Sequence, residues 1–157
     1  MADDIIKITS TGFEGVHKAL DNLASKIENP DEKLMKRLGG VVLVDINQRF
    51  MTRGRGTWAP LSSRTITRKG HDFVLIDTGA MFASAQITSL NKGRVSVGVL
   101  HGGARHNPEV PGYHQNGTSR IPQRKIIDVT PILHLALIVE IKTWVSDMLA
   151  AFKEATK

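Results

Sequence analysis

Residues 86–100 read QITSLNKGRVSVGVL, and this stretch decides the fold class of the chain. Two β-type runs, Gln86–Leu90 and Arg94–Leu100, are joined by the turn residues Asn91-Lys92-Gly93. In the second run every other residue is a valine from position 95 to 99, which is the period-two pattern of a half-buried strand. The stretch therefore predicts a β-hairpin.

Amphipathic helices are expected before the hairpin. Apolar residues recur at helical spacing from Phe13 to Ile27, and that pattern ends at Asn29-Pro30. A second helical pattern extends from Asp31 to Phe50 and begins with acidic residues, which the helix macrodipole favours. Gly39-Gly40 inside it predicts a kink or a close helix crossing.

Shorter elements are expected on either side of the hairpin. Ser62 is a candidate N-cap for a short helix toward Lys69 that ends at Gly70, and Thr78 is one for a helix over Gly79–Ala85. Two further segments predict strands: Ile5–Thr9, and Ile121–Val129 with a proline near its start.

A long helix is expected at the C-terminus, where Pro131 suits the first turn. Its apolar stripe is predicted to be Ile138, Ile141, Val145, Met148 and Phe152. The first half of this helix, ILHLALIVEI, is apolar nearly all round, so it is either buried deep in the domain or covered by another subunit. Together these elements predict an α+β fold, in which a small antiparallel sheet with a central hairpin packs against an N-terminal helix pair and the C-terminal helix.

The composition is that of one folded domain over residues 1–157, with mobile loops expected near 52–60 and 101–119. Hydrophobic residues make up 41% of the chain, and the absence of cysteine excludes disulfides and thiolate metal sites. No apolar run approaches the roughly 20 residues of a membrane span, and the acidic N-terminus is unlike a secretory signal. We therefore expect no membrane partner.

Charge is unevenly distributed along the chain. Residues 1–32 carry three Lys and seven Asp/Glu, residues 33–125 carry fifteen Lys/Arg and four Asp/Glu, and residues 126–157 carry three Lys and four Asp/Glu. The net charges are −4, +11 and −1, which sum to the +6 of the whole chain. A basic middle between acidic ends can attract a polyanion, or it can let neighbouring copies dock through opposite charges.

No catalytic, cofactor or metal site is predicted. His101, His106, Glu109 and His114 share one loop and could in principle hold zinc, but a loop rich in Gly and Pro holds no fixed ligand geometry. Exposed loop polarity is the preferred interpretation of these residues. There is no nucleophile elbow, P-loop or dinucleotide fingerprint, so we expect that the protein is not an enzyme.

The segment Lys33–Lys69 has a net charge of +8 and is either a nucleic-acid surface or a solvated helix face with a flexible arm. No reader motif accompanies it, so sequence-specific recognition is not expected, whereas non-specific contact with DNA stays open. Trp58, beside Arg53 and Arg55, is either a buried anchor or an interface hot spot.

Several short motifs come in a fixed order between Phe50 and Val129, which is about half of the chain. They are Trp58-Ala59-Pro60-Leu61, Thr65 with Lys69, Leu75 with Asp77-Thr78-Gly79, Val95-Ser96-Val97-Gly98, His114-Gln115 with Gly117, and Pro122 with Arg124. This order resembles the phage virion morphogenesis family, the tail-completion proteins of P2-like and Mu-like phages. The chain departs from that family where Tyr113 directly precedes His114, and where Lys125-Ile126-Ile127 follow the Pro-x-Arg element.

The resemblance implies a protein that completes the tail and stabilises head–tail joining at the phage neck. It implies a homo-oligomeric ring, expected to be hexameric, with other neck and tail proteins as partners. The implied location is the head–tail junction of the virion, after assembly in the host cytoplasm. A tail-terminator-type ring and a non-specific DNA-binding accessory protein are the alternatives.

The residues that this resemblance nominates for assembly contacts fall into two kinds. Gly79 and Gly117 are expected to serve the backbone, while His114, Gln115 and Arg124 are expected to form polar contacts, either within the chain or to another subunit. The full set of candidates is Arg53, Arg55, Trp58, Pro60, Leu61, Thr65, Lys69, Thr78, Gly79, His114, Gln115, Gly117, Pro122 and Arg124.

Overall fold

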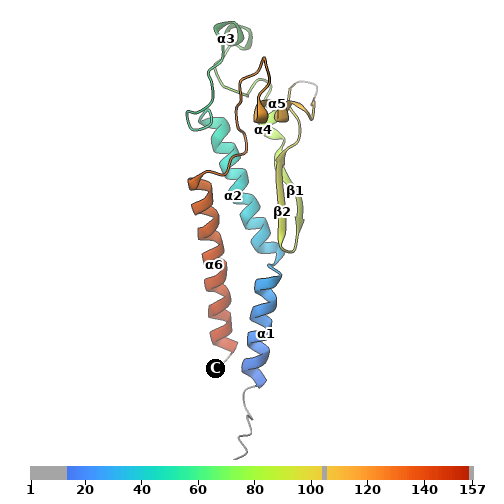
Figure 1. Cartoon of the computed structure of the whole chain (residues 1–157), viewed down its shortest axis with the longest axis vertical. Helices are drawn as coiled ribbons and strands as arrows, with labels where there is room; N and C mark the ends of the chain where they lie inside the picture. Colours follow the sequence, from blue (N-terminus) through green and yellow to red (C-terminus); the bar gives the residue numbers. More distant parts are fainter. Residues whose placement is uncertain (1–13, 104–105, 156–157) are drawn as a thin grey trace, which may run out of the picture.

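A computed structural model describes residues 14–103 and 106–155, which form an elongated molecule with two regions (Figure 1). The elements in chain order are α1 (Glu14–Glu28), α2 (Glu32–Met51), α3 (Ser63–Lys69), α4 (Ala80–Ala83), β1 (Ala85–Asn91), β2 (Arg94–Val99), α5 (Val110–Asn116) and α6 (Pro131–Ala155). We call α1, α2, the hairpin and α6 the stem, and residues 52–84 and 100–130, which include α3, α4 and α5, the crown. The predicted α+β class is confirmed, with the N-terminal helix pair, the hairpin and the long C-terminal helix all present. The predicted strand Ile5–Thr9 lies outside the described residues.

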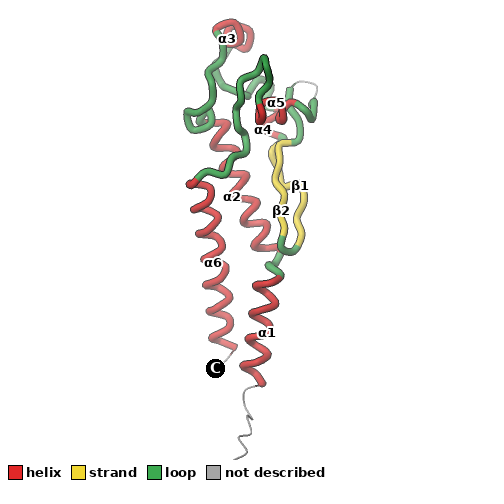
Figure 2. The backbone as a smooth tube through the Cα atoms, in the orientation of Figure 1, coloured by secondary structure: helices red, strands yellow, loops and turns green. Residues whose placement is uncertain are grey.

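The stem is a layer in which α6, α2 and the hairpin lie side by side, with α1 continuing toward the end opposite the crown (Figures 1 and 2). The break between α1 and α2 falls at the expected Asn29-Pro30, and Asp31 is the N-cap of α2, where its Oδ1 accepts a 2.8 Å hydrogen bond from the Leu34 N–H. α1 contacts α6, and α2 contacts α6 and both strands. None of the α1 residues is buried.

The hairpin is antiparallel, and its register pairs Ala85 with Val99 and Asn91 with Arg94. It packs on α2 at Gly39. A Cβ added to this glycine would lie 2.8 Å from Ile87 Cδ1 and 2.9 Å from Val95 Cγ2. The chain does come close at Gly39, but the predicted helix crossing is wrong there, because the neighbour is the hairpin; the alternative, a kink, stays a prediction.

The main hydrophobic core lies where the end of α2 enters the crown. It consists of the buried side chains Ile46, Phe50, Trp58, Val74, Met81 and Ile126. Phe50 contacts Trp58 and Phe82 edge to face, with ring centroids 5.8 and 5.6 Å apart. The Trp58 side chain is 5% exposed, and its Nε1–H donates a 3.1 Å hydrogen bond to the Lys125 carbonyl. Of the two alternatives for Trp58, the structure shows the buried anchor.

Two expectations for the crown are corrected. Ile121–Val129 is not a strand, because its backbone is held by other groups: the Arg124 N–H donates to the His114 carbonyl at 2.7 Å, and Gln115 Oε1 accepts from the Ile126 N–H at 2.8 Å. The segment 101–119 also contains the seven-residue helix α5, where only a loop was expected. The predicted mobility of this segment and of residues 52–60 stays a prediction.

The C-terminal helix buries a different face from the predicted one. Met148 of the predicted stripe is buried, but Ile141 and Val145 are 42% and 37% exposed. Leu133, outside that stripe, is 4% exposed. No helix among residues 14–103 and 106–155 combines the length and apolar character that crossing a membrane requires.

Candidate functional site

Half of the candidate residues line one cavity in the crown, which we call the crown cavity. Its volume is about 220 Å³. The seven candidates on its wall are Leu61, Thr65, Lys69, Thr78, Gly79, His114 and Arg124. The other lining residues are Arg68, Leu75, Asp77, Ala80, Met81, Gly103 and Val110. Motifs that lie up to 63 positions apart in the sequence, from Leu61 to Arg124, therefore meet at one site.

Helix α3 places three polar side chains on the cavity. Its N-cap is the expected Ser62, whose Oγ accepts from the Thr65 N–H at 3.3 Å, and it ends at Gly70 in the left-handed region with φ of 76°. The spacing of Thr65, Arg68 and Lys69 puts them on one side of the helix. Local capping therefore fixes the orientation of these cavity residues.

Lys69 lies in an environment that disfavours its charge. Its Nζ donates a 2.6 Å hydrogen bond to the Phe73 carbonyl. Burial lowers the pKa of Lys69, nearby Asp77 opposes this, and the positive charges of Arg68 and Arg124 lower the pKa further. Several cations therefore share the cavity with a single carboxylate, Asp77.

The Thr78-Gly79 pair also lines the cavity. Gly79 is the residue before α4 and has φ of 81°, a conformation that glycine adopts without strain. The Thr78 hydroxyl accepts a 3.4 Å hydrogen bond from the Ala80 N–H. Helix α4 begins at Ala80 and ends at Ala83, so it is shorter than the expected Gly79–Ala85, and its N-cap is Gly79 and not the expected Thr78.

Arg124 connects the cavity to the loop that carries Trp58. It is 6% exposed, and its Nε and Nη2 donate to the Ala59 carbonyl at 3.1 and 3.0 Å, with a longer 3.4 Å bond from Nη2 to the Pro60 carbonyl. Burial lowers its pKa. Arg124 therefore fixes the Trp58-Ala59-Pro60 segment through intramolecular bonds.

The two residues of the His-Gln pair on α5 differ in their hydrogen bonding. Gln115 bonds the chain after Arg124: its Oε1 accepts from the Ile127 N–H at 3.0 Å and its Nε2 donates to the Ile127 carbonyl at 2.6 Å. His114 has a buried Nδ1 with no hydrogen-bond partner among the described residues. Burial lowers the pKa of His114, and the positive charge of Arg124 lowers it further, so the neutral imidazole is favoured.

Gly117 follows α5 with φ of 74°, and a Cβ there would lie 3.0 Å from the backbone nitrogen of Gln123. A side chain at this position would meet both backbone strain and a clash. The glycine therefore allows the chain to return closely past the end of α5.

The remaining candidates lie outside the cavity. Arg53 pairs with Asp72 at the surface, and Arg55 Nη2 lies 2.6 Å from Asp45 Oδ1. Pro60 and Pro122 are exposed. These residues shape the crown or its surface without joining the seven that meet at the cavity.

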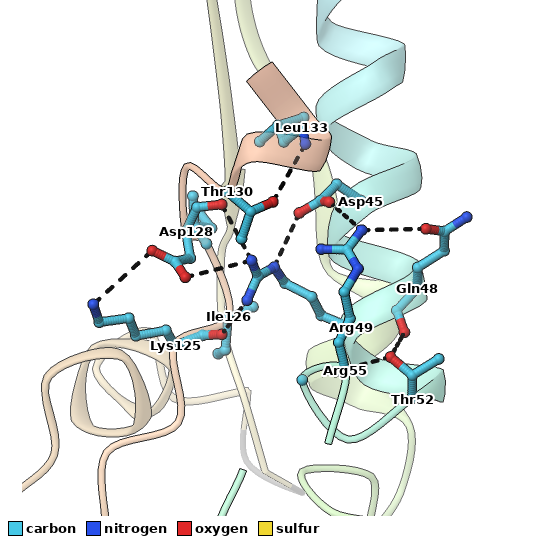
Figure 3. A network of polar contacts seen from close by, with 12 residues as sticks. Asp45, Gln48, Arg49, Thr52, Arg55, Lys125, Ile126, Asp128, Thr130 and Leu133 are labelled. Carbon is cyan, nitrogen blue, oxygen red and sulfur yellow. Dashed lines mark hydrogen bonds and ion pairs between the residues drawn. The ribbon is translucent and has the colours of Figure 1, made fainter. Parts of the chain in front are cut away.

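A buried polar network ties α2 to the chain that enters α6, and the sequence analysis missed it (Figure 3). Asp45 and Arg49 are 5% and 3% exposed and pair at 3.0 Å. Arg49 Nη1 donates to the Lys125 carbonyl at 3.5 Å, and Nη2 lies 3.5 Å from Asp128 Oδ2. The i,i+4 spacing of Asp45 and Arg49 could have indicated a pair, but on a helix it normally indicates a solvent-exposed one.

The stem carries an apolar groove between α2 and α6, which we call the stem groove, and its volume is about 520 Å³. Val44 and Ile132 on its wall are 55% and 60% exposed. Beside it, Leu135 and Val139 on the next turns of α6 are 62% and 59% exposed. The ion pair between Arg37 Nη2 and Glu140 Oε2, at 2.5 Å, lies at the groove. A continuous apolar face of α6 thus reaches solvent in the isolated chain.

Only two of the three loop histidines, His101 and His106, are in contact. The rings of His101 and His106 are 4.6 Å apart, while His114 lies on α5 at the crown cavity. Within residues 14–103 and 106–155 there is no group of three or more His, Cys, Asp or Glu side chains that could hold a metal ion.

The chain was compared with protein-family models, curated proteins and solved structures, and none of these comparisons finds a match.

Proposed function

We propose that this protein is a structural assembly protein of a phage, which completes the tail and stabilises head–tail joining at the neck as a ring of its own copies. The order of the motifs between Trp58 and Arg124 supports the phage assignment through its resemblance to the tail-completion family. The convergence of half of these residues on one cavity is what a shared architectural role would require.

The observation that carries the proposal is the exposed apolar face of α6. Ile132, Leu135 and Val139 are each about 60% exposed on successive turns. Contiguous apolar surface of this kind marks a protein or membrane contact on a folded domain. Two alternatives were open for this half of α6, deep burial or cover by another subunit; the described fold buries Leu133 but leaves Ile132, Leu135 and Val139 exposed.

Charge segregation supports contacts between copies that place unlike ends together. The described part of the crown carries eight Lys/Arg and four Asp/Glu, whereas α1 at the opposite end carries three Asp/Glu and two Lys. Unlike charge at the two ends steers docking in one orientation. Contacts between different surfaces of identical subunits form a ring when the rotation closes.

Light scattering of the purified protein, alone and with tail or connector proteins, tests this proposal. A hexameric ring of the 17.2 kDa chain has a mass of about 100 kDa. A phage lacking the gene is expected to accumulate heads and tails that fail to join stably. A chain that stays monomeric with every neck and tail partner, together with normal numbers of infectious virions from the deletion, would contradict the proposal.

A second candidate function, non-specific DNA binding, is favoured by the basic crown. Three exposed cations, Arg53, Arg64 and Arg68, lie there with Lys125 and Arg120. Binding that rests on phosphate contacts weakens steeply as salt rises, by about tenfold or more over the physiological range. Fluorescence anisotropy with a labelled duplex at several salt concentrations checks this candidate, and a lack of binding at low salt eliminates it.

A further inference from the structure

The crown cavity is smaller than an ordinary small-molecule pocket and has room for a side chain. Its volume of about 220 Å³ is below the roughly 300 to 1,000 Å³ of small-molecule pockets. Its apolar wall is formed by Leu61, Leu75, Met81 and Val110. A ligand that fits would have a short apolar stem.

The polar part of the wall is cationic and lacks an ion-pair partner. Among the described residues, none of the three cations Arg68, Lys69 and Arg124 has a carboxylate oxygen within 4.0 Å. Arg124 and Lys69 donate only to backbone carbonyls. Asp77 is the one acidic residue on the wall. Excess positive charge in a partly desolvated cavity favours an anionic ligand.

His114 is a further polar residue on the wall of the cavity. Its buried Nδ1 has no partner in the described part of the chain, and buried polar atoms normally have one. The neutral imidazole that this environment favours can donate one N–H to an anion. The preference of the cavity for an anion therefore comes from its unpaired cations, with the neutral His114 beside them.

We propose that the crown cavity is a carboxylate-binding site, which an acidic side chain of a second copy of this chain fills during assembly. This inference rests on the proposed function for its occupant. A carboxylate on an aliphatic stem matches both the cationic and the apolar parts of the wall. The second copy is the chosen source because α1, at the end of the molecule opposite the crown, presents the exposed acids Glu14, Asp21 and Glu28.

The chemistry of the site is tested with N-acetylglutamate as the probe and N-acetylglutamine as the uncharged probe of the same shape. Titrations followed by ¹H–¹⁵N NMR are expected to shift the amides of Thr65, Gly79 and Gly103 with the acid and not with the amide. No shift at millimolar N-acetylglutamate would overturn the site. Tighter binding of inorganic phosphate than of N-acetylglutamate would overturn the carboxylate assignment.

The matched variants come from one helix. Arg68→Gln with Lys69→Gln removes two cations from the wall, while Arg64→Gln removes an exposed cation of α3 that does not line the cavity. The double variant is expected to weaken N-acetylglutamate binding about tenfold or more, because hydrogen bonds to charged groups contribute on that scale. Arg64→Gln is expected to bind as the wild type does. Equal loss in both variants would show only a general charge effect and would contradict the inference.

The source of the carboxylate is tested by zero-length carbodiimide cross-linking of mixed ¹⁴N- and ¹⁵N-labelled protein. An amide bond between Lys69 of one isotope and an acidic residue of the other is expected, and mass spectrometry identifies that residue. Links from Lys69 only to Asp77 of the same copy would contradict the second copy as the occupant.

If a ring forms but the double variant assembles as well as Arg64→Gln does, this inference fails while the proposed function stands. A chain that never associates contradicts the proposed function, whereas failed N-acetylglutamate binding contradicts only the site.

Discussion

The crown and the stem differ in how their backbone groups are satisfied and in how much apolar surface they expose. In the crown, short helices and loops are held by side chains that bond to backbone, as Arg124 does at Ala59 and Gln115 does at Ile127. In the stem, long helices satisfy their own backbone, yet α6 leaves Leu135 and Val139 open to solvent. The difference teaches that the loops of the crown are fixed by hydrogen bonds within one chain, whereas the stem exposes an apolar face of the kind that we propose another subunit covers.

The largest effect is expected from Asp45→Ala, which breaks the network that joins α2 of the stem to Asp128 of the crown. This change leaves the half-buried Arg55 without a carboxylate and the buried Arg49 with only its 3.5 Å contact to Asp128, and breaking a buried pair in this way costs about 3 to 5 kcal/mol in the free energy of unfolding. Urea denaturation followed by Trp fluorescence measures it. The control is Asp72→Ala, which breaks the exposed pair with Arg53 and is expected to cost about 1 kcal/mol or less. Equal effects of the two changes would show that the Asp45–Arg49–Asp128 network is not structural.

Gly117→Ala tests the close return of the chain past α5. With φ of 74° and ψ of 168° its backbone lies in a region that essentially only glycine adopts, which costs another residue about 1 to 3 kcal/mol, and the added Cβ would lie 3.0 Å from Gln123 N, so we expect destabilisation of at least that order. Gly112→Ala within α5, where a Cβ meets nothing within 4 Å, is the control and is expected to be neutral or stabilising. Thermal unfolding of both variants checks the difference, and a neutral Gly117→Ala would contradict the assigned role.

The pH dependence of stability tests the environment of His114. Because its pKa is lowered in the folded protein, the unfolded chain binds the proton more readily, so stability falls as pH falls below about 6.5. The contribution is fully present above that value. His114→Gln is expected to flatten this part of the curve relative to His17→Gln, which changes an exposed histidine of α1. Urea denaturation between pH 5 and 8 is the measurement, and identical slopes in the two variants would contradict the prediction.

Leu135→Lys is expected to have the smallest effect on folding and to test the stem alone. Leu135 is 62% exposed, so the free energy of unfolding should change by about 0.5 kcal/mol or less. Association through the α6 face should nevertheless be lost, because a charge is then buried in an apolar contact. Sedimentation velocity with the neck or tail partner measures association separately from the free energy of unfolding. Lys142→Glu, an exposed change on the same helix, is the control, and equal assembly of both variants would contradict the role of this face.

Regular periodicity made the stem largely predictable from the sequence. The helices that begin near Asp31 and at Pro131 and the hairpin at Asn91-Lys92-Gly93 match their expected positions, because each element shows its own repeat and turn residues. The buried face of α6 was not predictable, since nearly every position in its first half is apolar and no stripe stands out. The Ile141 and Val145 positions chosen from spacing are exposed for this reason.

The crown was predictable in parts only. Its capping residues Ser62 and Gly70 were identified because capping depends on local chemistry. The false strand at Ile121–Val129 arose because a β-type pattern does not reveal that Gln115 takes up its backbone groups. The crown cavity brings together residues from α3, α4, α5 and Arg124, and only the three-dimensional fold places them on one wall. The phage resemblance itself stays a prediction.

The attachment of α6 has a mechanical consequence. Arg49 holds the Lys125 carbonyl and Asp128 directly against α2, just before α6 begins (Figure 3). A pull along α6 would therefore be transmitted sideways into α2 and would bypass the loops that surround the crown cavity. The cavity would then keep its shape while the long helices bear the load.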